Sequence, residues 1–107
     1  MTRFWIGFSS VILLLVIPTP VMAQDAGSSY KTKCAMCHGA DGKGDTPAGK
    51  KMGAHDFASD MVQKQSDAEL AQIISKGKNK MPAYGSKLKP EEIKDLVSYV
   101  RKLVNKP

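Results

Sequence analysis

Apolar side chains recur at helical spacing near the C-terminal end of the chain. In the stretch KPEEIKDLVSYVRKLV, residues 89–104, they stand three and four positions apart, which is the period of an amphipathic helix. The apolar positions are Ile93, Leu96, Val97, Val100, Leu103 and Val104. Pro90 suits the first helical position, and the acidic pair after it suits the positive end of the helix dipole. The pattern predicts a helix from Pro90 onward, with Lys89 as a weak N-cap.

A second helix is predicted over SDAELAQIISKG, residues 66–77. Ser66 and Glu69 can form a capping box, in which each side chain bonds to the backbone N–H of the other residue. Gly77 supplies a C-terminal stop. The apolar face consists of Leu70, Ile73 and Ile74.

Two less regular stretches also have helical character. AGSSYKTKCAMCH predicts a helix that begins near Asp25 and ends at residue 38, and SDMVQK, residues 59–64, predicts a short turn of helix. No segment alternates apolar and polar residues for long enough to predict a strand. The sequence therefore predicts an all-α fold with about three to five helices.

Residues 1–23 have the features of a secretory signal. Arg3 precedes an apolar run over residues 5–17, which is shorter than the ~20 residues of a membrane-spanning helix. Two prolines follow, and small residues stand where signal peptidase would cut after Ala23. We therefore predict an exported, periplasmic domain at residues 24–107, with no membrane span after cleavage. The alternative is an uncleaved N-terminal anchor.

The mature domain is small and basic. Of the 107 residues 84 remain, with three tyrosines, one phenylalanine and no tryptophan. A core this thin is marginal unless a bound group supplies hydrophobic mass. Loss of Arg3 leaves 15 of the 16 basic side chains against 10 acidic ones, a net charge of +5. Because the protein is expected to be exported, this charge indicates an acidic protein partner and not nucleic acid.

The motif CAMCH, residues 34–38, carries the chemistry of the chain. On one turn of helix, Cys34, Cys37 and His38 lie on the same face. The C-x-x-C-H spacing is a signature of covalent haem attachment. Two thiols can add across the two vinyl groups of a haem, and the adjacent imidazole then lies under the iron. Gly39 lets the chain turn away without a side chain against the porphyrin.

Other uses of these residues have less support in the sequence. A structural zinc site needs about four ligands, and His55 is the only further His or Cys, at no familiar spacing. A thioredoxin-like C-x-x-C lies in a βαβ context that is absent from the pattern. A disulfide between Cys34 and Cys37 is sterically awkward and leaves His38 unexplained.

The chain resembles the class I c-type cytochromes, in particular the short bacterial kind similar to cytochrome c6 and cytochromes c551–553. The resemblance rests on CAMCH, on KGKNKMPAYG at residues 76–85 and on the EEIKDLVSYVR helix that follows. It implies a small all-α fold wrapped round one covalently bound haem c, with crossing N- and C-terminal helices. It also implies that Tyr30 packs against the last helix near Val97, Tyr99 or Val100. Ala26 and Gly27 are candidates for the close approach at that crossing.

A second iron ligand decides what such a haem can do. The resemblance places it at Met81, in a loop before Pro82, whose ring favours an extended backbone before it. His38 and Met81 would then be the two axial ligands. Met61, Met52 and His55 are alternatives, whereas Met36 lies inside the attachment loop and cannot reach across the ring. His/Met ligation raises the reduction potential compared with bis-histidine and suits an electron carrier.

Supporting residues are less sharply defined. We expect His38 to donate its other ring N–H to a backbone carbonyl, with Pro47 or a neighbour as the acceptor. Candidates to line the haem pocket are Phe57, Leu70, Ile73, Ile74 and Leu96. Candidates to bind the propionates are Lys50, Lys51 and Tyr84.

The sequence predicts a monomeric one-electron carrier and not an enzyme. Lysines cluster on both sides of Met81, where they either steer an acidic redox partner or only keep a loop soluble. They are Lys76, Lys78, Lys80, Lys87 and Lys89. One alternative is a haem protein with a labile distal ligand, peroxidase-like or gas-binding. Another is a haem-free redox or metal-binding module built on C-x-x-C.

Overall fold

The computed structural model describes residues 2, 12–17 and 25–105. The predicted cleavage point after Ala23 and most of the predicted signal lie outside the described residues. Residues 12–17 belong to no helix, and their apolar side chains are largely exposed. The fold is therefore that of residues 25–105.

Six helices make up the described part of the chain, and no strand is present there. They are α1 Ala26–Lys33, α2 Ala35–His38, α3 Pro47–Met52, α4 Asp60–Gln63, α5 Asp67–Lys76 and α6 Pro90–Val104. One isolated antiparallel bridge joins Lys78 and Met81. The predicted all-α class is confirmed. None of the helices within these residues is long and apolar enough to cross a membrane.

The ends of α5 and α6 follow the capping signals in the sequence. The Ser66 hydroxyl accepts the Glu69 N–H at 3.1 Å, and Gly77 ends α5 with a φ of 76°. Helix α6 begins at Pro90, and the side chain of Lys89 makes no capping hydrogen bond. These boundaries are set locally, which is why the sequence predicts them.

The N-terminal half is more broken than the sequence pattern predicts. The predicted helix from Asp25 to residue 38 is two helices, and Cys34 stands between them with a φ of −118°. The stretch after the cysteine motif, over which the sequence pattern predicts no helix, contains α3. Thr46 is its N-cap and Pro47 its first residue, a favourable start for a helix too short to show an apolar period.

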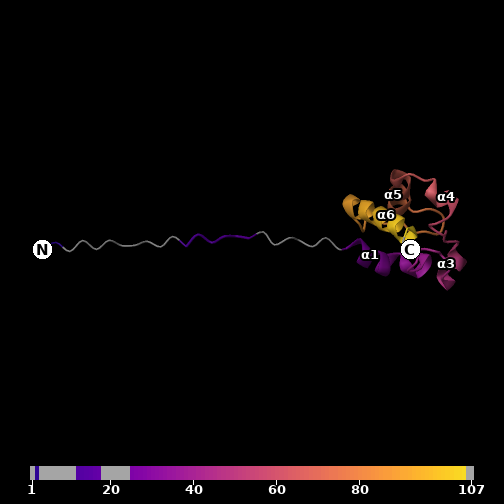
Figure 1. Cartoon of the computed structure of the whole chain (residues 1–107), viewed down its shortest axis with the longest axis horizontal. Helices are drawn as coiled ribbons and strands as arrows, with labels where there is room; N and C mark the ends of the chain where they lie inside the picture. Colours follow the sequence, from indigo (N-terminus) through magenta and orange to yellow (C-terminus); the bar gives the residue numbers. More distant parts are fainter. Residues whose placement is uncertain (1, 3–11, 18–24, 106–107) are drawn as a thin grey trace.

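The first and last described helices pack against each other, as predicted (Figure 1). Tyr30 of α1 is 1% exposed, and its ring centroid lies 5.1 Å from that of Tyr99 on α6. A Cβ on Gly27 would lie 3.4 Å from the Tyr99 ring, so the close approach falls at Gly27. Ala26 packs against the same core.

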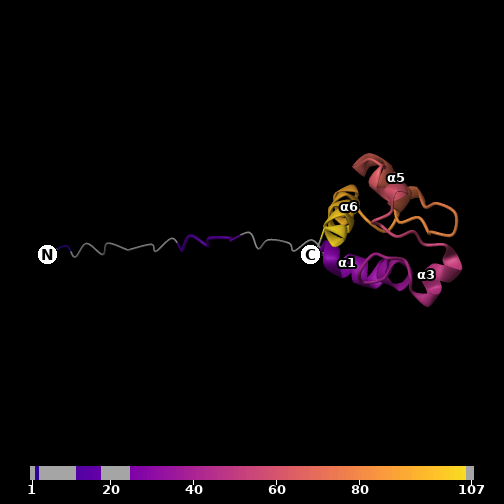
Figure 2. The ribbon, with the colours of Figure 1, turned by 45° about the vertical axis from the view of Figure 1, so that its right-hand side comes forward.

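Helix α6 connects the two sides of the domain. It packs against α1 on one side and α5 on the other (Figure 2). Helices α1, α2 and α3 follow one another along one side, and α5 with the segment after it forms the other. The buried cluster of the core lies between them and comprises Tyr30, Leu88, Ile93 and Leu96.

Candidate functional site

The two cysteines and His38 lie on one tight turn. The N–H groups of Cys37 and His38 both donate to the carbonyl oxygen of Cys34, at 3.3 and 2.9 Å. Gly39 then leaves the turn with a φ of 81°, the conformation expected for a residue that redirects the chain. Both thiols are half-buried and unpaired. The structure thus brings these three predicted residues together.

The environment of Cys34 does not activate its thiol. Burial raises the pKa of Cys34, and this outweighs the opposite effect of the neighbouring Lys33 charge. Dithiol oxidoreductases depend on a cysteine whose pKa is lowered. Cys34 therefore lacks the lowered pKa on which such an enzyme depends.

His38 carries a buried nitrogen that no protein group satisfies. Its Nδ1 has no hydrogen-bond partner within the described residues, and no hydrogen bond there joins the His38 ring to the predicted acceptor, the Pro47 carbonyl. The ring stacks on Phe57 with centroids 4.6 Å apart. Burial lowers the pKa of His38, while the backbone of His55 acts in the opposite direction. A buried, neutral imidazole with a free nitrogen is typical of a ligand to a metal or cofactor.

The donor set fits a haem better than a bare metal ion. Across residues 25–105, no three His, Cys, Asp or Glu side chains converge as they would round one metal ion. A haem does not require such convergence, because its iron takes the imidazole while the thiols bond at the ring edge. The unsatisfied nitrogen of His38, beside two unpaired thiols, is the arrangement that this group needs.

Thr46 joins the cysteine turn to α3. Its hydroxyl donates to the carbonyl oxygens of Met36 and Cys37, at 2.7 and 3.0 Å. The same oxygen accepts the N–H of Gly49 at 2.9 Å and so caps α3. A Cβ at Gly49 would collide with the Cys37 carbonyl oxygen, so α3 approaches the turn as closely as glycine allows.

Two tyrosines hold the ends of the cysteine segment, which we define as residues 33–39. The Tyr30 hydroxyl donates to the Gly39 carbonyl oxygen at 2.6 Å, and the Tyr84 hydroxyl donates to that of Lys33 at 3.0 Å. Burial raises the pKa of both phenols, so both remain protonated donors at neutral pH. Neither hydrogen bond is predictable from the sequence, because the acceptor lies 9 positions from Tyr30 and 51 positions from Tyr84.

Met81 lies in a tight hairpin. The backbone groups of Lys78 and Met81 pair in both directions, at 3.2 and 2.9 Å. Asn79 closes the turn with a φ of 53°. Met81 itself is half-buried. The bond from Tyr84 links this part of the chain to the cysteine segment.

The alternative ligands are more exposed than Met81. Met52 and Met61 are 49% and 52% exposed, and Met36 is 76% exposed. His55 is also exposed. Of these methionines, Met81 is therefore the one whose surroundings suit a buried ligand.

The predicted supporting residues are only partly brought to the site. Phe57 stacks on His38 and also packs against the buried cluster. Leu96 belongs to that cluster, and Ile74 packs against it. Lys50 and Lys51 are exposed at the end of α3. The Tyr84 hydroxyl, a predicted propionate donor, is engaged with Lys33.

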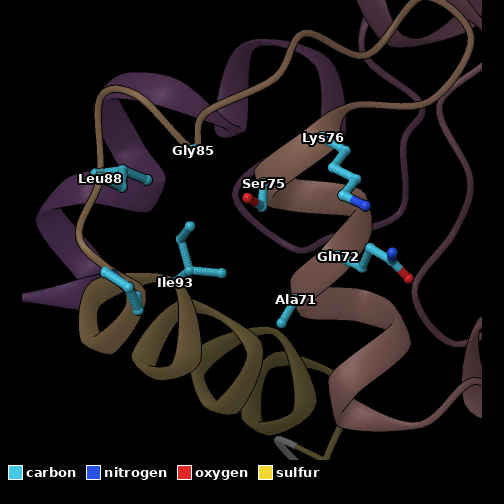
Figure 3. A pocket seen from close by; sticks show the side chains of 8 residues that line it. Ala71, Gln72, Ser75, Lys76, Gly85, Leu88 and Ile93 are labelled. Atoms are coloured by element: carbon cyan, nitrogen blue, oxygen red, sulfur yellow. The ribbon is translucent and has the colours of Figure 1, made fainter.

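Two hollows lie away from the cysteine turn. One, of about 290 Å³, lies between α5 and the start of α6 (Figure 3). It is lined by Ala71, Gln72, Ser75, Lys76, Gly85, Leu88, Pro90 and Ile93. The other, of about 500 Å³, lies between the loop after His38 and the end of α6. Neither is lined by a cysteine, His38 or Met81.

Comparisons with known proteins point to one family. The family model described as "Cytochrome C oxidase, cbb3-type, subunit III" matches residues 22–100. A cytochrome c6 of Nostoc sp. is 36% identical over 101 residues, covering 87% of this chain and 88% of the relative. A cytochrome c6 of Gloeothece citriformis is 34% identical over 103 residues, covering 86% and 88%. The solved structure of the KustC0563 c-type cytochrome superposes with a TM-score of 0.68 at 38% identity, covering 74% of this chain and 96% of that one.

Because the Thr46 hydroxyl both caps α3 and binds two carbonyls of the cysteine segment, we expect its removal to lower the stability of the fold markedly. Thr46→Val should lower the free energy of unfolding by about 2 kcal/mol, because it removes the N-cap of α3 and leaves two carbonyls unpaired. This corresponds to a fall of about 10 °C in the melting temperature, measured by circular dichroism. Thr46→Ser, which keeps the hydroxyl, should remain within a few degrees of the unchanged protein. Equal losses in both variants would contradict the role of the hydroxyl.

Proposed function

Because the chain belongs to the c-type cytochromes, we propose that it is an exported one-electron carrier whose haem iron is bound by His38 and Met81. The family carries covalently bound haem c, and the cytochrome c6 relatives from Nostoc sp. and Gloeothece citriformis align with 87% and 86% of this chain. When bound, haem supplies the one-electron chemistry through the ferric and ferrous states of its iron. The residues of this chain determine how the group is held and which ligands reach it.

The observation that carries the proposal is the buried, unsatisfied Nδ1 of His38 on the same turn as two unpaired thiols. Cys34 and Cys37 would form the two thioether bonds, and His38 would offer one of its two ring nitrogens to the iron. Stacking on Phe57 limits rotation of the imidazole, and Thr46 fixes the backbone that precedes it. These contacts orient the proximal ligand before any group is bound.

Met81 is the proposed ligand on the other side of the iron. Its half-buried position in a hairpin, compared with the exposed Met52 and Met61, supports this assignment. A thioether is a soft, neutral ligand that favours ferrous iron and so raises the reduction potential. With His38 and Met81 both bound to it, the iron would be closed to substrates and suited to electron transfer.

The lysines around Met81 support an acidic redox partner. All five side chains are exposed, and they lie on the segment that carries the proposed ligand or at its borders. They are Lys76, Lys78, Lys80, Lys87 and Lys89. A concentrated positive surface raises the encounter rate with an acidic protein. The predicted signal peptide supports a location outside the cytoplasm, where such a partner would be met.

Attachment through both cysteines is tested by extraction of the haem. We expect the haem of the unchanged protein to stay with the polypeptide in acidified acetone, because thioether bonds survive this treatment. A double variant, Cys34→Ala with Cys37→Ala, should release all of its haem into the solvent. The absorbance of the two phases gives the partition. Release from the unchanged protein would contradict covalent attachment.

Ligation by Met81 is tested with carbon monoxide. The ferrous protein should resist carbon monoxide, whereas Met81→Ala should bind it at least roughly tenfold more tightly, because the binding-competent state is then always populated. Its reduction potential should also fall. Met61→Ala is the matched control and should behave like the unchanged protein. Immediate binding of carbon monoxide by the unchanged protein would instead favour a gas-binding or peroxidase-like function.

The docking role of the lysines predicts a salt-dependent rate. Electron transfer to an acidic redox protein should slow by roughly tenfold between ~10 and ~300 mM salt, because the charges are screened. Lys78→Gln with Lys80→Gln should flatten this dependence, as measured by stopped-flow absorbance. Lys102→Gln, an exposed change near the other end of α6, is the control. A rate indifferent to salt would leave these lysines with a role in solubility alone.

A further inference from the structure

The segment that follows α5, residues 77–89, is hydrogen-bonded to the last turn of that helix. The N–H groups of Tyr84 and Gly85 donate to the carbonyl oxygens of Ile74 and Ser75, each at 2.9 Å. Figure 3 shows Gly85 beside this end of α5. These carbonyls are among the last of the helix and have no partner within it. The bonds hold the segment to α5, but they do not reach the cysteine segment.

One hydrogen bond crosses from this segment to the cysteine segment. The Tyr84 hydroxyl donates to the carbonyl oxygen of Lys33, the residue immediately before Cys34. Within residues 25–105, it is the one hydrogen bond that joins residues 77–89 to the cysteine segment. It therefore connects the two parts of the chain that carry the proposed iron ligands.

The backbone and the ring of Tyr84 are themselves held in place. The carbonyl oxygen of Tyr84 accepts the N–H groups of Lys87 and Leu88, at 3.0 and 2.9 Å. Leu88 is 6% exposed and belongs to the core, against which the Tyr84 ring also packs. Tyr84 stands three residues after Met81, so only Pro82 and Ala83 separate this anchor from the proposed ligand.

We infer that Tyr84 is a positioning residue that keeps Met81 at the iron by tying its segment to the cysteine segment. The inference rests on the proposed ligation by His38 and Met81. When Met81 leaves the iron, its segment moves and the bond to Lys33 breaks, so the hydroxyl stabilises only the ligated state. The net strength of one such bond corresponds to about two- to tenfold in the balance between the bound and released states.

Tyr84→Phe tests the inference, because it removes the hydroxyl and keeps the ring. In the ferric holoprotein, added imidazole competes with Met81 for the iron, and its apparent affinity increases with the population of the released state. We expect Tyr84→Phe to bind imidazole about two- to tenfold more tightly than the unchanged protein. The titration is followed in the visible spectrum.

A matched control separates positioning from general loss of stability. Tyr99→Phe makes the same chemical change in a half-buried ring on α6, away from the cysteine segment and from residues 77–89. It should bind imidazole within about twofold of the unchanged protein. An affinity of Tyr84→Phe no higher than that of Tyr99→Phe would overturn the inference.

Met81→Ala in the same titration distinguishes failure of the inference from failure of the proposed function. If Met81→Ala binds imidazole much more tightly than the unchanged protein while Tyr84→Phe does not, ligation by Met81 stands and the role of Tyr84 is overturned. If Met81→Ala and the unchanged protein bind imidazole equally, Met81 is not the ligand, and both proposals fall.

Discussion

The site depends on one turn of helix that is secured through its backbone carbonyls. Helix α2 has four residues, too few to be stable alone, and a helix leaves its last carbonyls without internal partners. Three side-chain hydroxyls supply donors to the cysteine segment, from Tyr30, Thr46 and Tyr84. They come from α1, from the N-cap of α3 and from the segment after α5. Much of the remaining fold therefore meets at this turn.

This form of support suits a domain with a thin core. In residues 25–105, the buried apolar side chains are Tyr30, Val62, Leu88, Ile93, Leu96 and Val97. Most of them belong to α6 and its partners, so apolar packing mainly stabilises the crossing of the terminal helices. The cysteine turn and α3 are joined by the Thr46 hydroxyl and by a close backbone approach at Gly49. A bound haem is a large, flat, mainly apolar group, and attached at Cys34 and Cys37 it would add packing that so few aromatic residues cannot provide.

How much of the molecule the sequence predicts depends on the range of the interactions. The limits of α5 and the start of α6 were predicted because Ser66, Gly77 and Pro90 act within a few residues. The break at Cys34 and the existence of α3 were not predicted, because helices of four and six residues are too short to show an apolar period. The shared turn of the cysteines and His38 follows from spacing alone. The donors that hold this turn come from 9 to 51 residues away, and no local pattern indicates them.

The difference between a carrier and a gas-binding haem protein lies in how firmly the second ligand is held. His38 is next to Cys37 in sequence, so covalent attachment of a haem at Cys37 keeps its imidazole near the iron. Met81 is not held near the iron by a neighbouring covalent bond, because more than forty residues separate it from the cysteines. Its hairpin fixes its local shape, and the bonds to α5 fix its distance from that helix. Neither constraint fixes its distance from the iron, which depends on contacts with the cysteine segment itself. Within residues 25–105, the Tyr84 phenol supplies the one hydrogen bond among those contacts, and the proposed ligation by Met81 would therefore depend on this tertiary bond as well as on the methionine.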